Sequence, residues 1–127
     1  MDRAKRTRPS PLAPGMLVIV ADGQSTAFTV VPGQRVTIGR DPGANIVVDD
    51  SNVSANHTQV ERRGPGWLVN SLDAANPTWI LDTTGRTQPI DGELGLRSGE
   101  LLIGKCQVML YPPDPRYNQT PGPVAQR

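Results

Sequence analysis

The chain has 127 residues, 36% of them hydrophobic, which is enough for one domain with a modest core. Its 13 Lys and Arg nearly balance its 12 Asp and Glu, so the overall charge gives no argument for a nucleic-acid-binding body. No apolar run is long enough to span a membrane, and the single cysteine, Cys106, cannot form a disulfide within one chain. These features favour a reducing, cytoplasmic setting, either for the chain alone or for the cytoplasmic domain of a larger protein.

The two ends of the chain differ in composition from its middle. Residues 1–15 are basic and rich in proline, and residues 114–127 are again rich in proline, while both segments are poor in large apolar side chains. Such segments gain too little from burial to offset the entropy lost on ordering. We expect a flexible tail at 1–15, a folded domain at 16–113, and a flexible tail or linker at 114–127.

Within the expected domain, nine short runs rich in β-branched and apolar residues follow one another. In chain order they are MLVIVA (16–21), TAFTVV (26–31), RVTIG (35–39), NIVV (45–48), HTQVER (57–62), WLVNS (67–71), TWIL (78–81), LLIG (101–104) and QVMLY (107–111). Turn signals containing glycine or proline separate them, and no window keeps an apolar period of 3.6 residues over three turns. The pattern predicts an all-β domain, a sandwich of two antiparallel sheets.

Three polar residues fall in the connections between these runs. Arg40 follows RVTIG, Ser54 lies ahead of HTQVER, and Asn76 lies between WLVNS and TWIL. A rigid sandwich displays ligand-binding groups on its connections, so these three residues are the first candidates for a site.

Ser54 and the only histidine, His57, also allow a hydrolase hypothesis, with Asp49 or Asp50 as the third member of a catalytic triad. No glycines flank Ser54 as they flank the serine of a nucleophile elbow. A lone histidine at the start of a strand is more often a structural hydrogen-bonding group, and we favour that interpretation for His57.

Three other binding classes find little support in the sequence. Residues 99–105, GELLIGK, nearly match a phosphate-binding loop, but Cys106 stands where a Ser or Thr is needed and the intervening residues have the pattern of a strand. One histidine and one cysteine give no recognisable zinc spacing. The basic residues near the N-terminus lack interleaved aromatic side chains that could stack on bases, so specific nucleic-acid binding is not expected.

The candidate residues, in their order along the chain, match the motif pattern of a known domain family. Gly39-Arg40, the stretch NIVVDD (45–50), Ser54-Ala55-Asn56-His57 and Asn76-Pro77-Thr78 together resemble the forkhead-associated (FHA) domain over residues 16–113. The resemblance implies a β-sandwich of eleven strands that binds phosphothreonine peptides through the loops at one end. It implies a binding module in Ser/Thr kinase signalling whose partner is a phosphothreonine protein, a kinase or a kinase substrate, with no catalytic residues, no metal and no cofactor.

The resemblance also implies a role for each residue. Arg40 would pair with the phosphate, whose charge is close to minus two and whose oxygens suit a guanidinium fork. Ser54 would donate its hydroxyl to another phosphate oxygen, and Asn76 would hydrogen-bond the ligand's main chain. Gly39 would shape the turn, and His57 would brace the loop that presents Ser54.

Two residues depart from the family pattern. Ala55 stands where the family very often has arginine, and Pro77 follows Asn76 where the family usually has glycine. Proline has no N–H, cannot adopt positive φ, and restricts the backbone of Asn76. Losing a charge-assisted partner costs about 1.5–3 kcal/mol, so we expect weakened or atypical phosphopeptide binding. The alternative hypothesis is an FHA-fold interaction or structural domain that has lost phosphopeptide recognition.

Overall fold

Eleven strands and no helix make up residues 14–112, the part of the chain that the computed structural model describes. The strands are β1 (Gly15–Ala21), β2 (Gln24–Val30), β3 (Arg35–Gly39), β4 (Ile46–Val47), β5 (Thr58–Arg63), β6 (Gly66–Ser71), β7 (Trp79–Leu81), β8 (Thr87–Pro89), β9 (Glu93–Leu96), β10 (Gly99–Ile103) and β11 (Cys106–Tyr111). The all-β class expected from the sequence pattern is confirmed, and so is the number of eleven strands that the family resemblance implies; the pattern itself marked nine of them. The expected tails at 1–15 and 114–127 lie outside the described residues, except that β1 already begins at Gly15.

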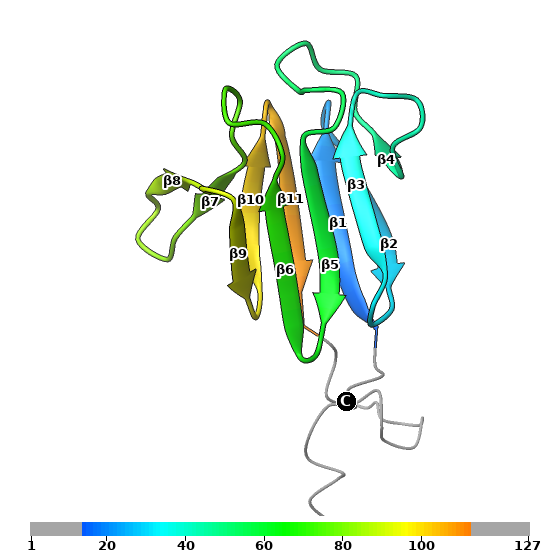
Figure 1. The fold of residues 1–127 in the computed structure, drawn as a ribbon, viewed down its shortest axis with the longest axis vertical. Helices are drawn as coiled ribbons and strands as arrows, with labels where there is room; N and C mark the ends of the chain where they lie inside the picture. Colours follow the sequence, from blue (N-terminus) through cyan, green and yellow to red (C-terminus); the bar gives the residue numbers. More distant parts are fainter. Residues whose placement is uncertain (1–13, 113–127) are drawn as a thin grey trace, which may run out of the picture.

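The strands form two sheets that pack face to face (Figure 1). The six-stranded sheet has the order β2-β1-β11-β10-β7-β8, and the five-stranded sheet has the order β4-β3-β5-β6-β9. All neighbouring strands are antiparallel except β3 and β4, which pair in parallel with Ile38 beside Ile46. The connection 40–45 therefore folds back past the end of β3, which sets residues 40–45 at that end of the sandwich.

The core lies between the two sheets and follows the two-residue period of the strands. Along β11, for example, Cys106, Val108 and Leu110 are buried while Gln107 is exposed. The buried apolar side chains are Leu17, Ile19, Val30, Val36, Ile38, Ile46, Val48, Val53, Val60, Trp67, Val69, Ile90, Leu101, Ile103, Cys106, Val108 and Leu110. These residues come mainly from the apolar runs that the sequence pattern marked as strands.

One charged side chain, Arg62, is fully buried at an inward-facing position of β5. Its Nη1 donates to the carbonyl oxygens of Gly64 and Gly66, and its guanidinium lies 5.4 Å from the ring centre of Trp67. Desolvation lowers the pKa of Arg62 from its ordinary value. Arg62 therefore fills the end of the core next to the β5–β6 hairpin.

The phosphate-loop-like segment 99–105 forms strand β10 and the turn into β11. Leu101 and Ile103 of this segment point into the core. This confirms that the segment is a strand and a turn, without the helix N-terminus that such a loop requires.

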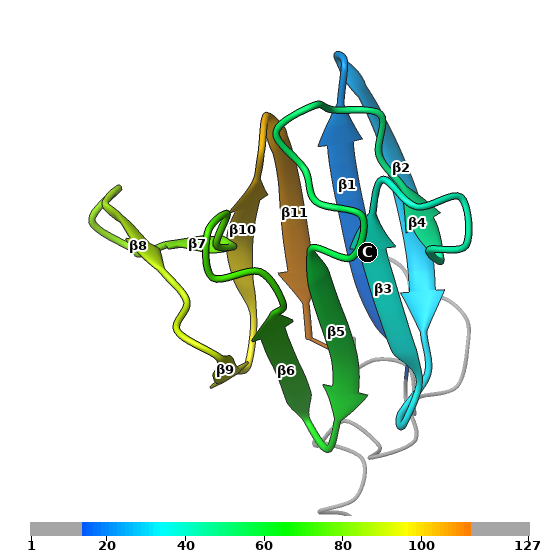
Figure 2. The ribbon, with the colours of Figure 1, turned by 45° about the horizontal axis from the view of Figure 1, so that its top comes forward.

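Several connections gather at one end of the sandwich. The β3–β4, β4–β5 and β6–β7 connections lie together there, and the start of β1 and the end of β11 lie at the opposite end (Figures 1 and 2). These three connections carry Arg40, Ser54 and Asn76 respectively. Among residues 14–112, no helix has the length and apolarity needed to cross a membrane.

Candidate functional site

Arg40 and Ser54 meet at the shared end of the sandwich. The Arg40 amide N–H donates to the Ser54 carbonyl oxygen at 3.0 Å, and the next residue, Asp41, donates its N–H to the Ala55 carbonyl oxygen at 3.1 Å. The Arg40 side chain is exposed, and within residues 14–112 its guanidinium makes no ion pair. The structure therefore places an exposed cation next to the loop that carries the Ser54 hydroxyl.

Gly39 makes this close approach of the two loops sterically allowed. A Cβ at Gly39 would lie 2.0 Å from the Ala55 carbonyl oxygen and 3.0 Å from the Ser54 carbonyl oxygen. Gly39 is the last residue of β3 and is not among the glycines with positive φ. The expectation that it shapes a turn is therefore replaced by a packing reason: a side chain at this position would push the Ser54 loop away.

His57 is almost fully buried and ties Ser54 to the neighbouring connection. Its Nδ1 accepts the Ser54 backbone N–H at 3.0 Å, so the ring proton resides on Nε2, which faces the Pro77 carbonyl oxygen at 3.4 Å. Its own main chain bonds to Ile38 and Leu72. Both ring nitrogens thus face backbone groups, and the geometry does not form the Ser–His pair that the hydrolase hypothesis requires.

The β6–β7 connection is anchored at both of its ends. At its start the Leu72 N–H donates to the His57 carbonyl oxygen. At its end Thr78 is fully buried, shares a hydrogen bond of 2.5 Å with the Thr58 hydroxyl, and donates its N–H to the Ser71 hydroxyl. These bonds hold the middle of the loop, residues 73–77, at the same end of the sandwich as Ser54. We call this end, formed by residues 40–45, 48–57 and 72–78, the rim.

Asp73 is the residue at this rim that the sequence analysis did not assign. Its Oδ2 accepts the Ser54 hydroxyl at 2.5 Å and lies 3.5 Å from the Asn76 side-chain nitrogen, and its Oδ1 accepts the Ala75 N–H at 2.9 Å. The Ser54 hydroxyl first, then the Ala75 N–H and the Asn76 amide, hold the pKa of Asp73 below its ordinary value. An aspartate before two small residues in a loop is typical of an Asx turn, but nothing in the sequence signals the contact with Ser54.

The three connections carry an unfavourable charge balance for an anion. Residues 40–45, 48–57 and 72–78 contain one arginine and no lysine, but four aspartates: Asp41, Asp49, Asp50 and Asp73. A hollow of about 550 Å³ beside Arg40 is lined by residues of the first two connections together with Val47. Arg40 is therefore the one strong cation that these connections offer to a ligand.

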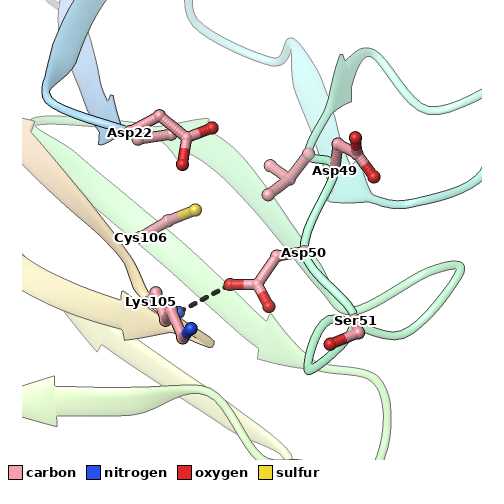
Figure 3. Close-up of a pocket in the computed structure, with 8 residues that line it drawn as sticks. Asp22, Asp49, Asp50, Ser51, Lys105 and Cys106 are labelled. Atoms are coloured by element: carbon pink, nitrogen blue, oxygen red, sulfur yellow. Dashed lines mark hydrogen bonds between the residues drawn. The ribbon is translucent and has the colours of Figure 1, made fainter.

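A second hollow, of about 250 Å³, lies beside the β10–β11 turn and is acidic (Figure 3). Asp22, Asp49 and Asp50 line it together with Lys105 and Cys106. The N–H groups of Lys105 and Asn52, with smaller contributions from the charges of Lys105 and Arg40, hold the pKa of Asp50 below its ordinary value. Asp50 thus braces the β4–β5 connection against the β10–β11 turn. Among residues 14–112, no group of three or more His, Cys, Asp or Glu side chains is placed to hold a metal ion.

Comparisons with known proteins agree with this fold. A family model described as "Inner membrane component of T3SS, cytoplasmic domain" (Yop-YscD) matches residues 19–114. The FHA domain-containing protein FhaB of Mycobacterium tuberculosis is 29% identical over 96 residues, which cover 75% of this chain and 59% of FhaB. The chain belongs to the forkhead-associated family.

Two solved FHA structures share the fold of the domain. The FHA domain of the CT664 protein from Chlamydia trachomatis aligns with a TM-score of 0.67 at 21% identity, covering 78% of this chain and 97% of the other. A structure from an analysis of phosphothreonine-dependent FHA domain interactions aligns with a TM-score of 0.63 at 22% identity, covering 77% and 95%. The chain spans two thirds or less of the length of the curated relatives it matches.

The two departures from the FHA pattern have visible consequences at the rim. Ala55 is exposed and contributes only its carbonyl oxygen, to the Asp41 N–H, so no second guanidinium accompanies Arg40. Pro77 presents its carbonyl oxygen to His57, and the preceding Asn76 directs its side-chain nitrogen to Asp73. The fold therefore brings Arg40, Ser54 and Asn76 to one end of the sandwich. There the Asp73 carboxylate accepts the Ser54 hydroxyl and lies near the Asn76 side-chain nitrogen.

Proposed function

We propose that this FHA domain binds phosphothreonine-containing proteins through Arg40, Ser54 and Asn76, with weakened or atypical affinity. The observation that carries the proposal is the 3.0 Å bond between the Arg40 N–H and the Ser54 carbonyl oxygen. It holds the backbones of the two residues together, so a guanidinium and a hydroxyl start from the same rim, where a phosphate dianion could accept from both. Gly39 and His57 support the site by letting the two loops approach and by holding the Ser54 backbone.

The partner and the setting belong to the same proposal. A phosphothreonine ligand implies a Ser/Thr kinase or one of its substrates as the partner, and one solved FHA structure with this fold comes from work on phosphothreonine-dependent interactions. The matching family model describes a cytoplasmic domain, which supports a cytoplasmic location. The domain acts as a reader of a modification made by another enzyme, and it needs no cofactor for that role.

A titration with a matched ligand pair tests the proposal. N-acetyl-phosphothreonine N-methylamide and its unphosphorylated counterpart are added to ¹⁵N-labelled protein, and amide shifts are followed residue by residue. We expect shifts centred on residues 40, 41 and 54 with the phosphorylated compound alone. Equal response to both compounds would overturn the proposal.

Two arginines near opposite ends of β3 supply a matched variant and control. Arg40→Ala should weaken binding of the phosphorylated compound at least about tenfold, because a charged hydrogen-bonding partner is worth about 1.5–3 kcal/mol. Arg35→Ala removes the same charge from the start of β3, where Arg35 pairs with Glu61, and should leave binding nearly unchanged. If Arg40→Ala still discriminates as the parent does, Arg40 does not bind the phosphate.

A second candidate function is favoured by one feature of the rim. The Ser54 hydroxyl donates to Asp73, and the Asn76 amide is directed at the same carboxylate. A rim where the Ser54 hydroxyl and one Asn76 N–H are already engaged suits an interaction domain that recognises an unphosphorylated partner. In that case a partner protein isolated with the domain would remain bound after phosphatase treatment, whereas phosphothreonine recognition predicts its release.

A further inference from the structure

The Ser54 hydroxyl has two competing uses at the rim, and it can serve only one of them at a time. A hydroxyl carries one proton. In the structure that proton is directed at Asp73 Oδ2, at an oxygen–oxygen distance of 2.5 Å. A phosphate dianion and an ionised carboxylate are both acceptors without a proton to give, so Ser54 cannot donate to both.

Asp73 is held firmly in this position by its own loop. Its Oδ1 accepts the Ala75 N–H at 2.9 Å in an Asx turn, and its carbonyl oxygen accepts the Asn76 N–H at 3.2 Å. The end of the loop is anchored to His57 and to Thr58, the first residue of β5. The carboxylate is thus presented to Ser54 by a braced turn, and rotating it away would break the turn's first bond.

Asn76 faces a milder version of the same competition. Its amide has two N–H donors, and the bond to Asp73 Oδ2 is long, at 3.5 Å. Asn76 can therefore serve Asp73 and a ligand together, whereas Ser54 must switch from one to the other. The competition is concentrated on Ser54.

We propose that Asp73 is an internal competitor for the phosphate site, an anion already seated on the Ser54 hydroxyl that a phosphothreonine ligand must displace. This inference rests on the proposed phosphothreonine binding through Arg40 and Ser54. Displacement leaves the Asp73 carboxylate and the phosphate at one rim, whose three connections contain a single arginine. Asp73 therefore lowers the affinity of the domain for phosphothreonine. The loss is greatest for ligands whose own bond to the Ser54 hydroxyl is weak.

The substitution Asp73→Asn tests the competition while keeping the turn. The asparagine oxygen can still accept the Ala75 N–H, and its amide group then donates toward Ser54, which frees the hydroxyl proton for the ligand. We expect N-acetyl-phosphothreonine N-methylamide to bind roughly tenfold more tightly, the effect of about one charge-assisted hydrogen bond. Asp73→Ser, which also keeps a side-chain acceptor for the turn, serves as the second variant if the first does not fold.

Asp82 provides a close control for this substitution. Its Oδ1 accepts the Thr84 hydroxyl at 2.6 Å and the Thr84 N–H at 2.8 Å, so it combines a hydroxyl donor and an Asx turn as Asp73 does. It lies between β7 and β8, outside the three connections that carry the site. Asp82→Asn removes the same charge and should leave phosphothreonine binding unchanged.

A double-mutant cycle identifies the route of the effect. In a Ser54→Ala background the hydroxyl proton is absent, so Asp73→Asn should give a clearly smaller gain than in the parent. An equal gain in both backgrounds would overturn the competition for Ser54. If the parent discriminates between phosphothreonine and threonine but Asp73→Asn binds no better than Asp82→Asn, the inference fails and the proposed function stands. If neither the parent nor Asp73→Asn discriminates, the proposed function fails and the inference fails with it.

Discussion

At the scale of single residues, the hydrogen bond between the Ser54 hydroxyl and Asp73 is the feature on which the proposed competition depends. It joins two residues 19 positions apart in the sequence and has the short length of a charge-assisted hydrogen bond. Because Ser54 makes the largest contribution to the lowered pKa of Asp73, the titration of Asp73 reports directly on this bond. The state of one serine can thus be measured through a neighbouring carboxyl group.

Ser54→Ala should raise the pKa of Asp73 toward the ordinary value for aspartate, since the strongest donor is lost while the Ala75 N–H remains. The measurement is a pH titration of the aspartate carboxyl ¹³C shifts. Thr84→Ala is the control, because the Thr84 hydroxyl makes the largest contribution to the lowered pKa of Asp82 and does not touch Asp73. An unchanged Asp73 titration in Ser54→Ala would contradict the observed bond.

The bond between Ser54 and Asp73 should also make the stability difference between the parent and Ser54→Ala depend on pH. A carboxyl group whose pKa is lowered by folding stabilises the fold above its unfolded pKa, about 3.9, and loses that contribution as the pH falls through the folded pKa. The difference in unfolding free energy between the parent and Ser54→Ala should therefore be fully present at neutral pH. It should narrow below about pH 4, as followed by urea unfolding across the pH range.

The sequence predicted some of these residues and could not predict others. Arg40, Ser54 and Asn76 were found because their spacing matches a known pattern, and the fold does bring them to one end. Asp73 was missed because its partner lies in another loop, and only the packing of the two sheets brings the loops together. The reason for Gly39 was also visible only in space, as the carbonyl oxygen of Ala55 that a Cβ would strike.

At the scale of elements, the β4–β5 and β6–β7 connections act as one unit because His57 bonds to both. Its Nδ1 holds the Ser54 N–H and its Nε2 faces the Pro77 carbonyl oxygen, while the ring is 1% exposed. A buried side chain of this size also fills space that its loss would leave empty. The rim therefore depends on a residue that does not reach its surface.

His57→Ala should lower the free energy of unfolding by about 2–4 kcal/mol, through the cavity and the unsatisfied backbone groups it leaves. Urea unfolding measures this loss, and amide hydrogen exchange locates it. Exchange at Ser54 should accelerate more than at Val108, which lies in β11 of the other sheet. Uniform acceleration of both amides would mean that His57 stabilises the whole domain without holding this loop in particular.

Strands β8 and β9 show where element prediction from sequence failed. All three residues of Thr87–Pro89 are exposed and Glu93–Leu96 is only partly buried, and neither segment contains an apolar run like those by which the other nine strands were found. Both are edge strands, β8 of the six-stranded sheet and β9 of the five-stranded sheet. Pro89 is tolerated in β8 because an edge strand has a side that needs no N–H donor. Their pairing is set by the neighbouring strand, which a single-sequence pattern does not encode.

At the scale of the whole molecule, the residues that stabilise the fold and the residues of the candidate site lie in different parts of the sandwich. The core lies between the sheets, while the three connections that carry the site lie at one end. Arg40 is an exposed loop residue outside the core, and surface substitutions of that kind usually change stability by less than about 0.5 kcal/mol. Binding and folding should consequently respond to different substitutions.

Ligand-linked thermal stability tests this separation in the intact chain. A ligand that binds only the folded state at about ten times its Kd adds about 1.4 kcal/mol, which should raise the Tm by roughly 6–10 °C for a domain of this size. Arg40→Ala should unfold at nearly the parent's Tm without ligand and gain little when N-acetyl-phosphothreonine N-methylamide is added. Arg35→Ala should keep the full ligand-induced rise. A large loss of Tm in unliganded Arg40→Ala would show that Arg40 supports the fold, and the separation of the binding end from the core would then be wrong.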